Sequence, residues 1–118
     1  INAVEQYKKA LEIKPNVPDV YYSLATAENN LAVDMEQGKV RMNIDDSLYS
    51  PKPDEINFDE PYKMSEKEKS AVAELYDSAV QNYQKYLDLS PNAEDKEAVE
   101  TQIKTITERD SVKSNSVE

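Results

Sequence analysis

The chain has 118 residues, of which 38% are hydrophobic and 32% are charged, and its 14 basic and 24 acidic residues give a net charge of −10. It has no cysteine, no histidine and only one glycine, which excludes disulfides, thiolate or imidazole metal sites, the common nucleophile–base pairs and a Gly-rich phosphate loop. The negative charge repels phosphate groups, so neither nucleic acid nor a membrane surface is an expected partner. The length fits one domain, and the glycine-poor composition favours an all-α protein. Because the residue types named above are missing, no catalytic residue, metal or cofactor is expected.

The first predicted helix covers residues 1–14. Small and apolar residues recur at intervals of three and four between Ala3 and Ile13, which is the spacing of one helix face. Pro15 disfavours helical geometry at the residue before it and ends this helix, whereas the fixed φ of Pro18 suits the first turn of the next one. The sequence therefore predicts two helices that meet at a tight turn.

The second predicted helix covers residues 18–42. Its apolar residues again recur at helical spacing, although Glu28 and Gly38 interrupt the pattern. The apolar stripe consists of Tyr21, Leu24, Leu31, Met35 and Met42.

The segment 43–64 holds three prolines, six acidic residues and several apolar side chains that we expect to be exposed. A loop of this length in a compact domain is usually functional or disordered, so two interpretations stay open: a solvated flap, or a packed element that binds a partner. Its carboxylates do not predict a metal site, because Ile56 stands where an EF-hand loop beginning at Asp54 needs Asp or Asn. The candidate partner contacts in this loop are Tyr49, Phe58 and Tyr62.

The third predicted helix covers residues 65–90 and begins with a capping box, in which Ser65 and Glu68 each bond to the other's backbone N–H. The fourth covers 93–109 and has a polar outer side, as the last helix of a solenoid must. Residues 111–118 are polar and are predicted to be a flexible tail. The apolar stripe of the third helix consists of Val72, Leu75, Tyr76, Ala79, Val80, Tyr83, Tyr86 and Leu87, and that of the fourth of Ala98, Val99, Ile103 and Ile106.

Two phrases repeat without a gap, YKKALEIKPN in the first helix and YQKYLDLSPN in the third. Each belongs to a pattern with offsets 0, 4, 7, 8 and 12: a small residue, an aromatic, a pair that packs onto the next helix, and a proline that turns the chain. The residues at these offsets are Ala3, Tyr7, Ala10, Leu11 and Pro15 in the first copy and Ala79, Tyr83, Tyr86, Leu87 and Pro91 in the second.

These phrases resemble the second helix of a tetratricopeptide repeat (TPR), a unit of about 34 residues that forms a helix hairpin. The stretch PDVYYSLA resembles the first helix of the following repeat, with Tyr21 at the large position, Leu24 at the leucine position and Ala25 at the small position. The resemblance implies antiparallel helix-hairpin repeats, a TPR-like α-solenoid fragment with about four helices. It also implies a C-terminal fragment that begins at the second helix of a repeat.

The spacing of the two turn prolines departs from this family. Pro15 and Pro91 are 76 residues apart, which is one repeat plus roughly 42 residues. We expect the insertion to lengthen the helices 18–42 and 65–90 by roughly ten residues each and to supply the acidic loop 43–64. The expected organisation is a TPR-like helical domain over 1–110 with one elongated hairpin.

TPR proteins bind peptides or proteins on a concave surface lined by the first helix of each repeat, so the resemblance implies a non-catalytic interaction scaffold. Asp19 and Ser23 occupy positions at which chaperone-binding members carry Lys and Asn, so an acidic peptide is disfavoured and a neutral or basic partner is expected. The candidate partner contacts on this face are Tyr22, Thr26 and Asn29.

Other functions stay open. The chain could be a purely structural C-terminal cap or an oligomerisation element of a longer repeat protein, whereas an enzyme or its regulatory subunit is disfavoured by the missing residue types. Because the helix 1–14 has no hairpin partner, Val4, Tyr7 and Leu11 are expected to be partly uncovered, and a homodimer through this helix is a further expectation. The sequence indicates no particular compartment.

Overall fold

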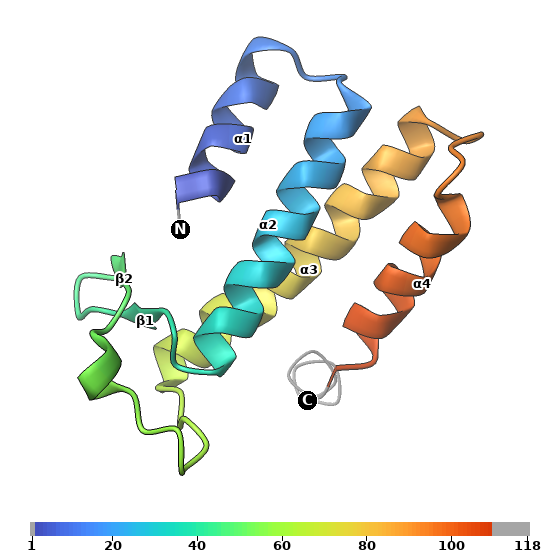
Figure 1. The fold of residues 1–118 in the computed structure, drawn as a ribbon. Coiled ribbons are helices and arrows are strands. Elements are labelled where there is room, and N and C mark those ends of the chain that lie inside the picture. Colours follow the sequence, from blue (N-terminus) through green and yellow to red (C-terminus); the bar gives the residue numbers. More distant parts are fainter. Residues whose placement is uncertain (1, 110–118) are drawn as a thin grey trace.

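The computed structural model describes residues 2–109. Its four α helices lie side by side in chain order, and each runs antiparallel to the one before it (Figure 1). The predicted all-α class and helix hairpins are confirmed, with a small two-stranded sheet in addition, whereas the predicted tail at 111–118 lies outside the described residues. The elements are α1 (Asn2–Ile13), α2 (Pro18–Glu36), β1 (Arg41–Met42), β2 (Leu48–Tyr49), the 3-10 turn η1 (Pro53–Glu55), α3 (Glu66–Leu89) and α4 (Lys96–Thr107).

The turn between α1 and α2 forms where the prolines predict it. Pro18 is the first residue of α2, and the helix before it ends at Ile13. The hydroxyl of Tyr21 donates a hydrogen bond of 2.7 Å to the carbonyl of Pro15, so the large residue of the first turn of α2 also fixes the end of the preceding helix.

The end of α2 differs from the prediction. The helix stops at Glu36 and not at Met42, because Gly38 adopts a positive φ of 74°. The N–H of Gly38 bonds to the carbonyl of Met35 and that of Lys39 to the carbonyl of Asp34, which is the Schellman arrangement that ends a helix at a glycine. The expectation that the insertion lengthens this helix as far as Met42 is therefore wrong.

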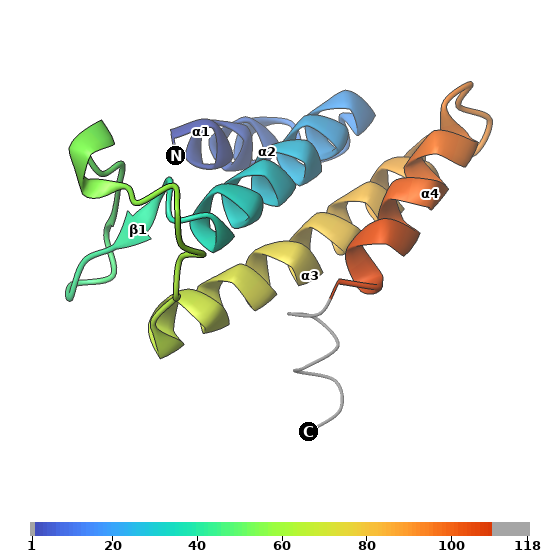
Figure 2. The same cartoon turned by 60° about the horizontal axis from the view of Figure 1, so that its bottom comes forward.

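The segment between α2 and α3 contains a short hairpin, which the sequence did not predict. In its sheet Arg41 lies opposite Tyr49 and Met42 opposite Leu48, in antiparallel register. Figures 1 and 2 place this hairpin at the end of the bundle where α2 stops and α3 starts, close to the beginning of α1. We refer to residues 37–65 below as the insert.

The core lies between α2 and α3 and extends to both outer helices. The small residues Ala25 and Ala79 are fully buried, which lets the two central helices approach closely. Val4 is also buried, so the expectation that it is partly uncovered is wrong, whereas Tyr7 and Leu11 are partly buried as expected. Within residues 2–109, no helix is both long enough and apolar enough to span a bilayer.

Most residues at the TPR positions divide by burial as their roles predict, with packing residues inside and the turn prolines outside, but the small residue Ala3 is exposed, unlike its counterpart Ala79. The buried ones are Leu24, Ala25, Ala79, Tyr83, Tyr86 and Leu87, the partly buried ones are Tyr7, Ala10, Leu11 and Tyr21, and the exposed ones are Ala3, Pro15 and Pro91.

Candidate functional site

A shallow groove runs between α2 and α4, with α3 as its floor. Its volume is about 330 Å³, and it brings together the three predicted contacts on α2 with residues of two other helices. The α4 side of the groove could not be predicted from the sequence, because the position of α4 beside α2 across α3 depends on the tertiary fold. The lining residues are Tyr22, Thr26, Asn29, Asn30, Tyr83, Ala98, Val99 and Gln102.

Tyr22 forms the aromatic end of the groove. Its ring is 39% exposed and makes edge contacts with the rings of Tyr83 and Tyr86, with centroid separations of 5.7 and 5.3 Å. Such edge-to-face pairs stabilise a ring in one orientation. Tyr22 therefore presents a fixed aromatic surface to the groove.

The hydroxyl groups beneath Tyr22 are already bonded inside the protein. The hydroxyls of Thr26 and Tyr83 lie 2.8 Å apart, and burial raises the pKa of Tyr83. The hydroxyl of Tyr86 donates to the carboxylate of Asp95 at 2.7 Å, and this bond raises the pKa of Tyr86 to about 12. Both tyrosines are thus neutral at physiological pH, and their hydroxyl hydrogen bonds tie α3 to α2 and to the start of α4.

Asn29 is the polar residue in the groove whose bonding is incomplete. It is only 8% exposed, and its Oδ1 is buried without a hydrogen-bond partner among the described residues. A buried acceptor without a partner costs about 1–3 kcal/mol, so such atoms are usually satisfied by a ligand or by ordered water. Because this oxygen is itself shielded from solvent, a donor in the groove, such as a peptide N–H, would reach it after the Asn29 side chain turned toward the groove.

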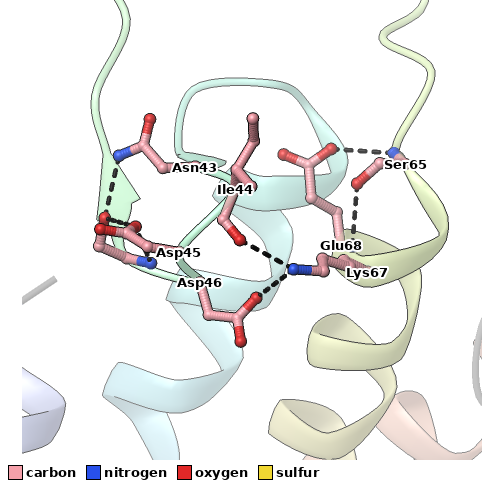
Figure 3. Close-up of polar contacts among 8 residues, drawn as sticks. Asn43, Ile44, Asp45, Asp46, Ser65, Lys67 and Glu68 are labelled. Carbon is pink, nitrogen blue, oxygen red and sulfur yellow. Dashed lines mark hydrogen bonds and ion pairs between the residues drawn. The ribbon is translucent and has the colours of Figure 1, made fainter.

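The insert is held at both ends by one buried carboxylate. Glu68, in the first turn of α3, accepts the N–H of Met42 at 2.9 Å, the hydroxyl of Tyr62 at 2.8 Å and the N–H of Ser65 at 2.9 Å. The predicted capping box of Ser65 and Glu68 is confirmed, and Figure 3 shows the two side chains at the start of α3. Burial opposes ionisation of Glu68, but these hydrogen bonds outweigh it and lower its pKa.

The neighbouring Lys67 fixes the turn of the hairpin. Its Nζ donates to the carbonyl of Ile44 at 2.9 Å and to the carboxylate of Asp46 at 2.7 Å, as Figure 3 shows. The same turn is closed internally by Asp45, whose carboxylate accepts the hydroxyl of Ser47 at 2.6 Å. The hairpin is therefore attached to α3 at its turn as well as at its base.

The model of the family described as TPR repeat matches residues 2–27, which span α1, the turn and the first half of α2. Residues 2–27 are therefore similar to a TPR repeat. No curated protein and no solved structure gives a significant match to it. TPR repeats typically take part in protein–protein interactions, so this similarity indicates proteins as the general class of partner.

The three aromatic residues predicted in the insert lie in different surroundings. Tyr62 packs inside the insert, with the guanidinium of Arg41 4.5 Å from its ring centre. Tyr49 is partly buried in β2, opposite Arg41. Phe58 is 79% exposed and lies beside Ile56 and Pro61 in a hollow of about 350 Å³. The structure does not bring these three side chains together with the groove between α2 and α4.

Helix α2 also carries a buried acid, Glu28, which in the sequence is visible only as an interruption of the apolar stripe. Glu28 is 1% exposed and accepts hydrogen bonds of 2.6 Å from both the hydroxyl of Ser78 and the amide of Asn82 on α3. Burial raises the pKa of Glu28, although the two hydrogen bonds and the charge of Lys8 oppose it. Ser78 and Asn82 are four residues apart on one helix face, which was the available signal for a shared polar partner.

Carboxylates are frequent in this chain, but they are dispersed. Among residues 2–109, no group of three or more acidic side chains is arranged to hold a metal ion. The two buried carboxylates, Glu28 and Glu68, use their hydrogen bonds to join helices and to cap α3.

Proposed function

We propose that this chain binds an extended segment of a protein partner in the groove between α2 and α4. The observation that carries the proposal is the buried Oδ1 of Asn29, which lacks a donor among the described residues. Asn30 and Gln102 add further amide groups along the same groove. Amides on both walls can bond to the backbone of a peptide, while the ring of Tyr22 supplies an apolar contact.

The charge of the groove favours a neutral or basic partner. Among residues 2–109, no charged side chain lines it, and the chain as a whole carries a net charge of −10. The attraction of a basic segment would therefore be long-range and would fall with added salt. A partner that relies on an acidic tail would be repelled on approach.

A second part of the proposal concerns the insert. We interpret residues 37–65 as an insertion within a TPR hairpin, and the exposed ring of Phe58 makes it a candidate for additional partner contacts. Phe58 lies next to Ile56 and Tyr62 around one hollow, with acidic residues close by in the sequence. This surface suits an apolar side chain flanked by a positive charge.

The test is an affinity capture from source-cell lysate with three forms of the chain. One form is unchanged, one carries Asn29→Ala with Tyr22→Ala, and one has residues 43–64 replaced by a short Gly/Ser linker. A partner that is retained by the linker form and lost from the double variant supports the groove. A partner lost only from the linker form supports the insert, and Lys9→Ala, on the exposed side of α1, is the matched control.

Self-association through α1 is a separate proposal. A groove of about 360 Å³ between α1 and α2 is lined by Val4, Tyr7, Ala27 and Leu31 among others, and a second copy of α1 could pack there. Sedimentation velocity over a wide concentration range tests it, because a mass that stays at one chain contradicts the dimer. If no partner is captured by any form, the structural-cap interpretation gains support instead.

A further inference from the structure

A second and larger groove lies on another face of the molecule, where the insert meets the helices. It has a volume of about 610 Å³, compared with about 330 Å³ for the groove between α2 and α4. Its walls come from α1, α2, the hairpin and α3. Without the hairpin one wall would be absent, so this groove is a consequence of how the insert folds.

The inner surface of this groove is apolar. Met35 is fully buried and Leu31 nearly so, whereas Met42, Leu48 and Leu75 pack only partly against the core. Methionine side chains adapt their shape to different apolar partners. The groove can therefore accommodate an apolar side chain of a ligand.

The charges around this apolar surface are mostly negative. Four carboxylates line the groove against one ammonium group. The acids are Glu5, Glu28, Asp46 and Glu74, and the base is Lys8. Asp46 is paired with Lys67, and Glu28 is bonded to α3, but Glu5 and Glu74 are exposed and without a salt bridge among the described residues. The excess of negative charge favours a cationic ligand group beside the apolar one.

The hairpin wall is fixed in place before any ligand arrives. Lys67 holds the carbonyl of Ile44 and the carboxylate of Asp46, and Glu68 holds the N–H of Met42 (Figure 3). Both anchoring residues belong to the first turn of α3, which is itself capped by Ser65. A preformed wall lowers the ordering cost of binding.

We propose that this groove binds a peptide segment in which an apolar side chain is adjacent to lysine or arginine. The apolar side chain lies between Leu48 and Leu75, and the cation lies at the rim formed by Glu5 and Glu74. This site is independent of the groove between α2 and α4, because none of the lining residues is shared.

The proposal is tested by amide NMR titration of the ¹⁵N-labelled chain with two synthetic peptides, acetyl-ALKALKAG-amide and acetyl-ALEALEAG-amide. The basic peptide is expected to shift amides at Leu31, Met35, Leu48 and Leu75 and to bind about tenfold more tightly than the acidic one. Leu75→Lys fills the groove and adds a positive charge, so it should abolish these shifts. Ala98→Lys, which puts the same charge into the other groove, should leave them unchanged.

Three results would overturn the proposal. They are equal affinity for the two peptides, shifts confined to Tyr22, Thr26 and Gln102, or an equal loss of affinity for the basic peptide in Leu75→Lys and Ala98→Lys. The last result would mean that only the overall charge matters. Circular dichroism verifies the fold of each variant. If Leu75→Lys does not fold, Glu74→Lys at the exposed rim replaces it, and this variant must bind the basic peptide more weakly than wild type does.

Discussion

The Oε2 of Glu68 accepts the backbone N–H of Met42 at 2.9 Å, although 26 residues separate the two in the sequence. The other oxygen of the same carboxylate accepts the hydroxyl of Tyr62 and the N–H of Ser65. One side chain at the start of α3 thus closes the insert, holding a residue near its beginning and two near its end. The insert is a closed element and its position is coupled to the cap of α3.

Glu68→Gln is expected to destabilise the fold by about 1–3 kcal/mol at neutral pH, because a charged acceptor of several hydrogen bonds becomes neutral. The pKa of Glu68 is lowered in the folded state, so its contribution is present above the unfolded value of 4.5 and is lost as the pH falls through the folded pKa. This difference in the free energy of unfolding is measured by urea unfolding of wild type and variant between roughly pH 3 and 7, where carboxylates titrate. It should shrink on acidification.

The control for this experiment is Glu66→Gln, two residues earlier on the exposed side of α3, where the carboxylate makes only a surface pair with Lys69. Surface pairs contribute about 0–1 kcal/mol. A difference for Glu68→Gln that is no larger than that of the control, or one that grows on acidification, would contradict the role assigned to Glu68.

Gly38→Ala is expected to destabilise the fold by at least about 1–3 kcal/mol, the usual cost of holding a non-glycine residue in a strained conformation. Gly38 has φ of 74°, and a Cβ atom there would lie 2.6 Å from Cγ of Tyr62. The positive φ and the close contact both destabilise Gly38→Ala. In that background, Tyr62→Ala is expected to relieve the contact but not the backbone strain. Thermal unfolding of the two single variants and the double variant gives the coupling energy.

A double variant that is more stable than the sum of the single effects predicts confirms the contact between Gly38 and Tyr62. Strict additivity would mean that only the backbone conformation matters. Either way, the positive φ at this position favours the one glycine of the chain, and the closeness of Tyr62 is a second reason only if the two effects are coupled.

The helices of this fold could be predicted from the sequence because their signals are local. Pro15 and Pro18 place the first turn, Ser65 and Glu68 place the start of α3, and the apolar stripes identify the faces that pack. The partner-facing positions on α2 followed from the TPR phrases, and Tyr22, Thr26 and Asn29 do line one groove.

The remaining features depend on tertiary contacts. The apolar stripe continues at helical spacing to Met42 and so predicts a helix that is too long. The correct stop signal is Gly38, whose positive φ ends α2 at Glu36. The strands of the hairpin have two residues each, too short for a pattern of period two to be visible. The groove beside Leu48 and Leu75 joins four elements and could not be inferred from any one of them.

Tyr86→Phe is expected to lower the free energy of unfolding by about 1–2 kcal/mol and to loosen the start of α4. The hydroxyl of Tyr86 donates to Asp95, the residue that precedes α4, at 2.7 Å. Without it, the start of α4 loses its hydrogen bond to α3, while Val99 and Ile106 still pack on the core. Hydrogen exchange should accelerate at the first turns of α4 and stay unchanged in α1, and uniform acceleration along the chain would contradict a local effect.

Glu28→Gln should become more stable relative to wild type as the pH rises. Burial raises the pKa of Glu28 above its usual value of 4.5, so the folded state binds the proton more tightly than the unfolded state. The stability that this group contributes is therefore fully present below pH 4.5 and is lost as the pH rises through the folded pKa. Glutamine keeps the shape and an acceptor for Ser78 or Asn82 but does not titrate.

The measurement is urea unfolding of both proteins at several pH values, weakly acidic to neutral, with Glu74→Gln as the exposed control. The free energy of unfolding of wild type minus that of Glu28→Gln should fall steadily with pH, opposite in sign to the trend for Glu68→Gln. A difference that is independent of pH would mean that Glu28 is ionised equally easily in both states. In that event the hydrogen bonds from Ser78 and Asn82 would compensate fully for burial, and Glu28 would act as a structural anion between α2 and α3.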